Sequence, residues 1–426
     1  MTQEKRRIPV KDPRRVDLKR VLMIVSIFGP AVLVSVELFD PASIITATQA
    51  GAVCGFDILW AALYSGIMLI CIQEVSARLG VVTGKTLAEN IHQRLGQRYS
   101  MPLFSISLVM NVGTLTAEIM GFSLAMSFLL GIPYPIAIAC SILLIILLVF
   151  MTSYDILEKF LIILVTAIFL SYIYFLFSLN APFDTIAYKS LVPSLNGNSI
   201  YYAVAIIGAS IMPTYVILHS GLVYEKGWAH HHEKGVEDLI KTEDKSIKKE
   251  RIDSVVSIFM GTILSIIIIA SAALLIGGAS MTSFQDIAAP FDIQFGTAGV
   301  TIFAIAFAFA GILAIVTMGL GTVYSAFGFW GMASRINERR FRLAFVLALV
   351  ISGMLALIPN QIRVIVFTQY LNGLLLPFIL VPLVVITRNK ELMGKYTLRG
   401  VSLILALATI VITTTLFVAN IVSMLL

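Results

Sequence analysis

The stretch Ser35-Val36-Glu37-Leu38-Phe39-Asp40-Pro41-Ala42-Ser43 places a carboxylate and a proline in the middle of a long hydrophobic segment. A second hydrophobic segment is interrupted in a similar way by Gly208-Ala209-Ser210-Ile211-Met212-Pro213-Thr214. In lipid, an opened helix is tolerated only in buried protein or beside a cavity, because its backbone groups need partners. Paired interruptions in two halves of a chain indicate a transporter's substrate site. An ionisable residue at such a break is a candidate ligand, and here it is Asp40.

Composition identifies the class of protein. The chain is 58% hydrophobic and 13% charged, and its mean hydropathy is +0.95. A helical span of a bilayer needs about 20 mostly apolar residues, and the sequence contains eleven such stretches. They cover residues 23–50, 56–79, 103–130, 133–151, 157–179, 200–224, 255–278, 297–332, 341–358, 363–387 and 401–425. The sequence therefore predicts an all-α integral membrane protein, with no cleavable signal peptide before the first span.

The basic residues predict the orientation of these spans. All but two of the 30 Lys and Arg fall in the N-terminal tail or in loops on the same side of the membrane, the exceptions being Lys189 and Arg363. Lys and Arg accumulate on the cytoplasmic side. We therefore expect a cytoplasmic N-terminus and an external C-terminus in a cell membrane, the inner membrane of a prokaryote. The net charge of +6 follows from this topology and does not point to nucleic acid.

The sequence contains no motif of a soluble enzyme, because CxxC, HExxH, GxSxG, Walker-type and GxGxxG patterns do not occur. We expect neither an enzyme nor a bound cofactor, and we expect a monomer in the lipid bilayer. The run His230-His231-His232 lies in the longest predicted cytoplasmic loop, 225–254. A solvated polar loop is the preferred interpretation, and a metal-sensing tract is the alternative.

Few carboxylates lie within the predicted spans. Glu37 precedes Asp40 by three residues, so the two would share a face of a helix. Glu74 precedes Arg78 by four residues and can pair with it. Glu118 lies in the middle of the third span, where two interpretations are open. It either holds two helices together through hydrogen bonds or relays a proton.

The residues around the two breaks favour a divalent cation as ligand. They offer the Asp40 and Glu37 carboxylates, the Ser43 hydroxyl, opened carbonyls such as that of Ala209, and the Met212 thioether. Oxygen ligands suit Mg²⁺ and Mn²⁺, whereas a thioether favours softer transition metals. A substrate with its own carboxylate would be repelled by Asp40.

Several motifs resemble those of the Nramp family of divalent metal transporters along almost the whole chain. Near the start, Gly29-Pro30, Asp40-Pro41 and Gln49-Ala50-Gly51 match a GP…DPGN…QAG stretch. Residues 76–80 (SARLG) and 82–85 (VTGK) match a specific loop of the family. Met212-Pro213 with residues 218–220 (LHS) is similar to its helix six, and Gln369 with residues 376–378 (LPF) is similar to its helix ten.

The resemblance implies a LeuT-type fold, in which two inverted five-helix repeats are followed by an eleventh helix. The corresponding units would be an N-terminal tail 1–22, a first repeat 23–180, a second repeat 181–387 and a final unit 388–426. In the family, the metal is held by the residues that match Asp40, Ala209, Met212 and Gln369. The position of the family's metal-binding Asn is taken here by Ser43.

The departures from the family pattern concern proton movement and the ligand set. The family's His after Met-Pro is replaced by Thr214, and an Asp in helix three is replaced by Leu115. Neither Thr nor Leu titrates at physiological pH. The remaining candidates for a proton path are Glu118, Glu37 and His219. Because Ser43 is shorter than Asn and Glu37 adds a carboxylate, the site would be roomier and more negative.

These departures predict a divergent member that resembles the Nramp-related magnesium transporter branch. The predicted function is alternating-access transport of Mg²⁺, Mn²⁺ or both, with weak or absent proton coupling. A proton-coupled Mn²⁺ or Fe²⁺ importer that uses Glu37 or Glu118 is the first alternative. An organic-cation carrier and a transport-inactive sensor are the others.

Overall fold

The computed structural model describes residues 40–151, 168–194, 199–225, 236–278, 280–332 and 338–425. All regular elements in these ranges are helices. The helices, in chain order, are α3 (Pro41–Cys54), η1 (Gly55–Ile58), α4 (Leu59–Thr83), α5 (Leu87–Leu95), α6 (Gln97–Leu130), α7 (Tyr134–Met151), an apolar helix Ile168–Ser178, α9 (Phe183–Leu191), α10 (Ser199–Ser210), α11 (Pro213–Glu225), α12 (Val236–Ile276), α13 (Phe284–Phe329), α14 (Arg339–Leu355), α15 (Gln361–Leu375), α16 (Pro377–Thr387), α17 (Lys390–Met393), η2 (Gly394–Tyr396) and α18 (Gly400–Leu425).

The helices of the described residues agree with the predicted spans. Seven continuous or merged helical segments there are long and apolar enough to cross a membrane, and two shorter apolar helices accompany them. The chain is thus a multi-pass, all-helical membrane protein. One boundary differs from the prediction, because α12 begins at Val236 and so occupies much of the predicted loop 225–254. That segment is rich in Lys and Glu, which are good helix formers, so a polar composition did not exclude a helix.

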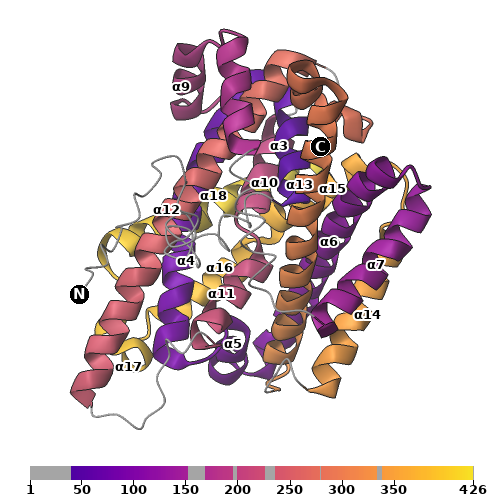
Figure 1. Cartoon of the computed structure of the whole chain (residues 1–426). Helices are drawn as coiled ribbons and strands as arrows, with labels where there is room; N and C mark the ends of the chain where they lie inside the picture. Colours follow the sequence, from indigo (N-terminus) through magenta and orange to yellow (C-terminus); the bar gives the residue numbers. More distant parts are fainter. Residues whose placement is uncertain are drawn as a thin grey trace, which may run out of the picture.

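The long helices cross one another in a bundle, with short helices at its ends (Figure 1). The label of α9 lies at one end of the bundle and those of α5 and α17 lie near the opposite end. α13 contains a break at Gly296, which has φ 60° and separates a first helical part from the long span that follows. The predicted span 297–332 starts directly after this break.

α3 and α10 each pack closely against another helix, because a glycine lies at each crossing. A Cβ atom on Gly51 of α3 would lie 2.3 Å from the carbonyl oxygen of Ile269 on α12. A Cβ atom on Gly208 of α10 would lie 2.0 Å from the carbonyl oxygen of Gln369 on α15. Small residues at helix crossings let backbones approach within a bilayer, where dispersion contacts stabilise association. These crossings hold α3 and α10 in the centre of the bundle.

The second interruption occurs where the sequence predicts it, and a helix begins at the position predicted for the first. α3 begins at Pro41, directly after Asp40, which has extended backbone angles. The second interruption separates α10, which ends at Ser210, from α11, which begins at Pro213. Proline is favoured in the first turn of a helix and disfavoured further in, because it has no N–H and clashes with the preceding turn.

Candidate metal site

Asp40 caps the first turn of α3. Its Oδ1 accepts a hydrogen bond from the backbone N–H of Ser43 at 2.5 Å, and the whole residue is buried. Aspartate is among the best N-cap residues because it satisfies an N–H that has no partner in the helix. The same position brings the carboxylate to the positive end of the helix dipole. Oδ1 is thereby fixed by the fold, and Oδ2 is the oxygen that remains for a ligand.

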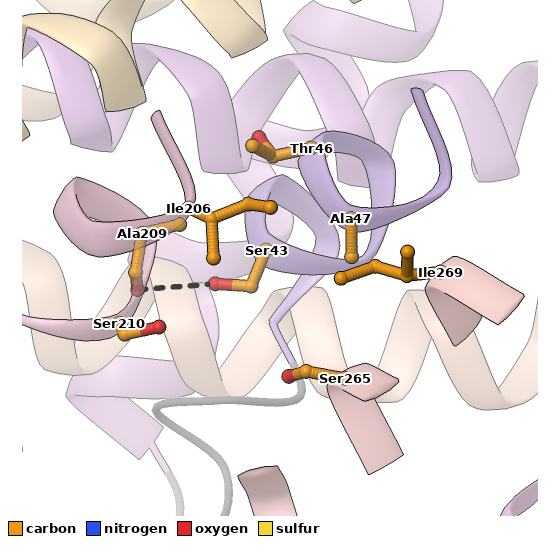
Figure 2. Close-up of a pocket in the computed structure, with 8 residues that line it drawn as sticks. All are labelled: Ser43, Thr46, Ala47, Ile206, Ala209, Ser210, Ser265 and Ile269. Atoms are coloured by element: carbon orange, nitrogen blue, oxygen red, sulfur yellow. Dashed lines mark hydrogen bonds between the residues drawn. The ribbon is translucent and has the colours of Figure 1, made fainter. Parts of the chain in front are cut away.

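Ser43 joins the two interrupted segments directly. Its hydroxyl donates a hydrogen bond of 3.3 Å to the carbonyl oxygen of Ala209 on α10 (Figure 2). Asp40, Ser43 and Ala209 are thus brought together by two consecutive contacts, as the sequence predicts for a shared site. The Ala209 bond is long for a hydroxyl donor, so little free energy is lost when a stronger partner replaces it.

The availability of the Ala209 carbonyl has a cause in the sequence. In a continuous helix this oxygen would accept from the N–H four residues later. That residue is Pro213, which has no N–H. Met212 lies between the two helices and its carbonyl accepts from Tyr215 and Val216, at 3.1 and 3.2 Å, which starts α11. Met212 itself is almost completely buried.

A second buried carboxyl group faces Asp40. Glu118 of α6 is fully buried and interacts electrostatically with Asp40. Gly121, one turn later, packs against Pro41, where an added Cβ would lie 2.5 Å from the proline Cβ. Among the described residues, Oδ2 of Asp40 and both carboxyl oxygens of Glu118 are buried, and the polar groups that Glu118 meets are the Asp40 carboxyl group and the backbone N–H of Ala42. Two such groups are stabilised in a bilayer by a cation or a shared proton, since carboxylates repel each other.

Gln369 lies on α15, beside the same region. Its Oε1 accepts a hydrogen bond of 3.0 Å from Asn372, and Asn372 also donates to Thr114 of α6 at 2.7 Å. Thr114 is one turn from Glu118 on α6, so the two lie on one face of that helix. Nε2 of Gln369 and Oδ1 of Asn372 are buried and have no partner among the described residues. Asn372 and Thr114 were not among the residues predicted for the site. The i, i+3 spacing of Gln369 and Asn372 could have indicated that the two amides share a face of one helix.

Neutral side chains occupy the two positions where the sequence departs from the family in groups for proton movement, Thr214 and Leu115. Thr214 donates a hydrogen bond of 2.5 Å to Oδ1 of Asn111, and Asn111 donates to Ser107 at 3.2 Å. Ser107 in turn shares a hydrogen bond of 2.8 Å with Ser325 of α13. Leu115 is fully buried in the hydrophobic core. The polar chain from α11 across α6 to α13 therefore contains only hydroxyls and an amide.

The remaining candidates lie away from this centre or beyond the described residues. His219 is on α11, two turns past the break and about 10 Å further along the helix axis. Glu37 precedes the described part of the chain, as does the start of the first predicted span, and the histidine run 230–232 also lies outside it. Glu74 forms the predicted ion pair with Arg78. No group of three or more His, Cys, Asp or Glu gathers within the described ranges, so a site here depends on carbonyl, hydroxyl, amide and thioether ligands as well.

A small cavity adjoins the Ser43–Ala209 contact, between α3, α10 and α12 (Figure 2). It is lined by Ser43, Thr46, Ala47, Ile206, Ala209, Ser210, Ser265 and Ile269. Half of these residues carry hydroxyl groups, and none of the side chains that line it is aromatic or charged. Two of the predicted ligands, Ser43 and Ala209, therefore border both the Asp40 carboxylate region and this cavity.

Comparison with known proteins identifies the family. A family model described as "Natural resistance-associated macrophage protein-like" (Nramp) matches residues 31–423. The chain belongs to the Nramp family. This confirms the resemblance and the prediction that the chain is not an enzyme, because the family consists of transporters.

Relatives and solved structures agree with this assignment. The chain is 27% identical over 405 residues to the protein named divalent metal cation transporter MntH of Staphylococcus aureus strain bovine RF122, covering 87% of this chain and 85% of that protein. The MntH of strain JH9 is 28% identical over 399 residues, with the same coverage.

The fold is similar to that of the manganese transporter of Eremococcus coleocola, with a TM-score of 0.76, 20% identity and coverage of 97% and 89%. The nucleobase-cation-symport-1 family transporter Mhp1 in a closed conformation gives a TM-score of 0.55 at 15% identity, with coverage of 92% and 91%. These similarities confirm the predicted all-helical, LeuT-type fold.

Proposed function

We propose that this Nramp protein carries divalent metal cations across a membrane by alternating access. The observation that carries the proposal is a buried pair of carboxyl groups, in which Asp40 at the start of α3 faces Glu118 of α6. The names of the MntH relatives and of the structurally similar manganese transporter support the same substrate class. The cation would lie between Asp40, the carbonyl of Ala209 and the oxygen of Ser43. Met212, directly before α11, and Gln369 of α15 would be further ligands.

Within this class, we propose Mg²⁺ and Mn²⁺ as the substrates. Ser43 offers a shorter oxygen ligand than the Asn of the family pattern, which leaves space for water. Mg²⁺ gives up its waters reluctantly and binds through one or two carboxylates with several waters retained. The Met212 thioether favours the softer ion Mn²⁺. Glu37 would add a third carboxylate and is retained as a proposed ligand.

The proposed transport has weak or absent proton coupling. In the chain Thr214–Asn111–Ser107–Ser325, hydroxyls and an amide take the place of titratable groups. Such groups do not take up or release a proton at physiological pH. Without coupling, an inside-negative membrane potential would drive uptake by about 2.3 kcal/mol per charge per 100 mV. Glu118, Glu37 and His219 are the groups through which coupling would persist in the alternative.

An organic cation is less well supported as a substrate. The cavity beside Ser43 is lined by aliphatic and hydroxyl side chains, and ammonium groups are recognised by aromatic cages. We further propose that the chain acts as a monomer, with the N-terminus in the cytoplasm and the C-terminus outside, in agreement with its charge distribution. The units 1–22, 23–180, 181–387 and 388–426 remain the proposed organisation.

The test is uptake of Mg²⁺ and Mn²⁺ into liposomes that contain the purified protein, with a pH dye inside and the voltage clamped by valinomycin. We expect both ions to accumulate with little or no acidification of the lumen, and protein-free liposomes give the background. Accumulation with stoichiometric acidification would contradict weak coupling and favour Glu118 or Glu37 as proton carrier. Failure to accumulate either ion would contradict the proposed transport.

A further inference from the structure

The cavity beside Ser43 has a size that suits a single small ligand. It lies between α3, α10 and α12 and has room for about one water molecule. Thr46, one turn after Ser43 on α3, contributes a fully buried hydroxyl that has no hydrogen-bond partner among the described residues. Buried polar groups without a partner are rare, and an ordered water is a common explanation.

The polarity of the cavity wall restricts what this ligand is. The hydrogen of the Ser43 hydroxyl is directed to the Ala209 carbonyl, at 3.3 Å. The hydrogen of the Ser265 hydroxyl is directed to the carbonyl of Gly261 in its own helix, at 3.0 Å. Because each hydroxyl has a single hydrogen and two lone pairs, these two groups have only lone pairs left for the cavity. The two serines therefore offer only hydrogen-bond acceptors to the cavity.

A third serine follows the same pattern. Ser210 shares one hydrogen bond of 2.9 Å with Ser65 of α4, so one hydroxyl hydrogen is used between them. A ligand that donates hydrogen bonds to the serine oxygens fits such a wall better than an anion, for which only the Thr46 hydroxyl has a hydrogen without a partner among the described residues. A water molecule that binds a metal cation through its oxygen has both hydrogens directed away from the cation. Its hydrogens then need acceptors in the surrounding protein.

From this match we infer that the cavity holds a water of the cation's hydration shell, and that Thr46 and Ser265 bind it. The inference rests on the proposed function and makes the substrate more specific: it is a partly hydrated divalent cation. The cation sits at Asp40, and the water extends from it past Ser43 and Ala209, which border both spaces. A cation that retains water strongly, such as Mg²⁺, depends on these hydroxyls more than Mn²⁺ does.

The test compares variants of two threonines on the same helix. Thr46→Val removes the cavity hydroxyl with almost no change of shape. Thr48→Val is the matched control, because the Thr48 hydroxyl is buried and donates to the Ile44 carbonyl of its own helix at 2.7 Å. Mg²⁺ and Mn²⁺ affinities are measured by calorimetry on the full-length protein in detergent, and Thr46→Ser serves as the conservative rescue.

We expect Thr46→Val to weaken Mg²⁺ binding about five- to tenfold, the effect of one hydrogen bond to a polarised water, and to weaken Mn²⁺ binding less. Thr48→Val and Thr46→Ser should bind both ions as the parent does. If Thr46→Val does not fold, Ser265→Ala on α12 is expected to lower the Mg²⁺ to Mn²⁺ affinity ratio in the same direction.

Several outcomes would overturn the inference. An unchanged ratio of Mg²⁺ to Mn²⁺ affinity in the folded variants would overturn the inference and leave the proposed function in place. An equal loss of affinity for both ions would have the same meaning. A loss of Mg²⁺ affinity in Thr48→Val as large as in Thr46→Val would show a general effect of the helix. A parent protein that binds neither ion would overturn the proposed function, and this inference with it.

Discussion

The two oxygens of Asp40 have different tasks, and a pair of substitutions separates them. Oδ1 caps α3 by accepting from the Ser43 N–H at 2.5 Å, and Oδ2 is buried in a carboxyl group that interacts with Glu118. Asp40→Asn keeps an acceptor oxygen for the cap and replaces the charge with a neutral amide. Asp40→Ala removes the cap and the charge together. Comparing the two therefore distinguishes folding from cation binding.

The expected magnitudes follow from this geometry. Asn and Asp are equivalent N-cap residues, whereas Ala in their place costs about 1 kcal/mol of stability. For a chain of this length, that corresponds to a drop in the unfolding midpoint on the order of 2 °C. Removal of the charge affects binding far more, because a divalent cation in a low-dielectric site loses its principal counter-charge. We expect affinity to fall at least about a hundredfold in both variants, which is roughly 2.8 kcal/mol.

The assay combines thermal unfolding in detergent with Mn²⁺ binding measured on the same preparations. Asp40→Asn should unfold at the midpoint of the parent or above it, since it removes a buried charge that faces a second buried carboxyl group, Glu118. It should not bind Mn²⁺ at concentrations that saturate the parent. Asp40→Ala should bind equally poorly and unfold at a lower temperature than Asp40→Asn.

Two results would refute the reasoning. A folded Asp40→Asn protein that binds Mn²⁺ with the parent's affinity would show that the cation does not use this carboxylate. Equal midpoints for Asp40→Asn and Asp40→Ala would show that the cap contributes nothing measurable to α3. The two results are independent, so the assignment of each oxygen is tested by itself.

Two further substitutions test the packing and the ligand set. Gly51→Ala would place its Cβ 2.3 Å from the Ile269 carbonyl oxygen, and we expect a loss of about 1–3 kcal/mol and a lower unfolding midpoint. Gly113→Ala is the control, because its Cβ would make an ordinary contact of 3.6 Å with Thr368; equal midpoints for the two variants would contradict the close crossing. Met212→Leu conserves volume and removes the thioether, so competition binding should show a reduced preference for Mn²⁺ over Mg²⁺ with an unchanged fold. An unchanged preference would exclude the sulfur as a ligand.

Parts of the site were predictable because local chemistry dictates them. A proline is disfavoured inside a helix because it has no N–H, and α3 and α11 do begin at Pro41 and Pro213. Proline alone does not decide a break, since Pro102, Pro290 and Pro382 lie inside helices. The opened carbonyl of Ala209 follows from the same reasoning, since it lies four residues before a proline. Asp40 directly before a proline has the position of an N-cap, and the structure places it there.

Other parts depend on which helices become neighbours. Nothing local to Asn111 or Asn372 indicates that Thr214 of α11 donates to Asn111, or that Asn372 bridges α15 to Thr114 of α6. Each of these side chains has many possible partners in the chain. The polar α12 extension into the predicted loop was missed for a different reason, because charged composition indicates exposure to water and leaves helix formation open.

The sequence by itself determined the membrane class, the start of α3 at Pro41, the interruption between α10 and α11, and the carboxylate that precedes α3. It could do so because hydropathy, missing proline N–H groups and helix capping act over a few neighbouring residues. Only the tertiary structure decided that Glu118 faces Asp40, that Ser43 reaches Ala209, and that a hydroxyl-lined cavity adjoins them. These contacts join residues far apart in the chain, and they form only when close helix crossings such as that of Gly51 with Ile269 fix the helices against one another.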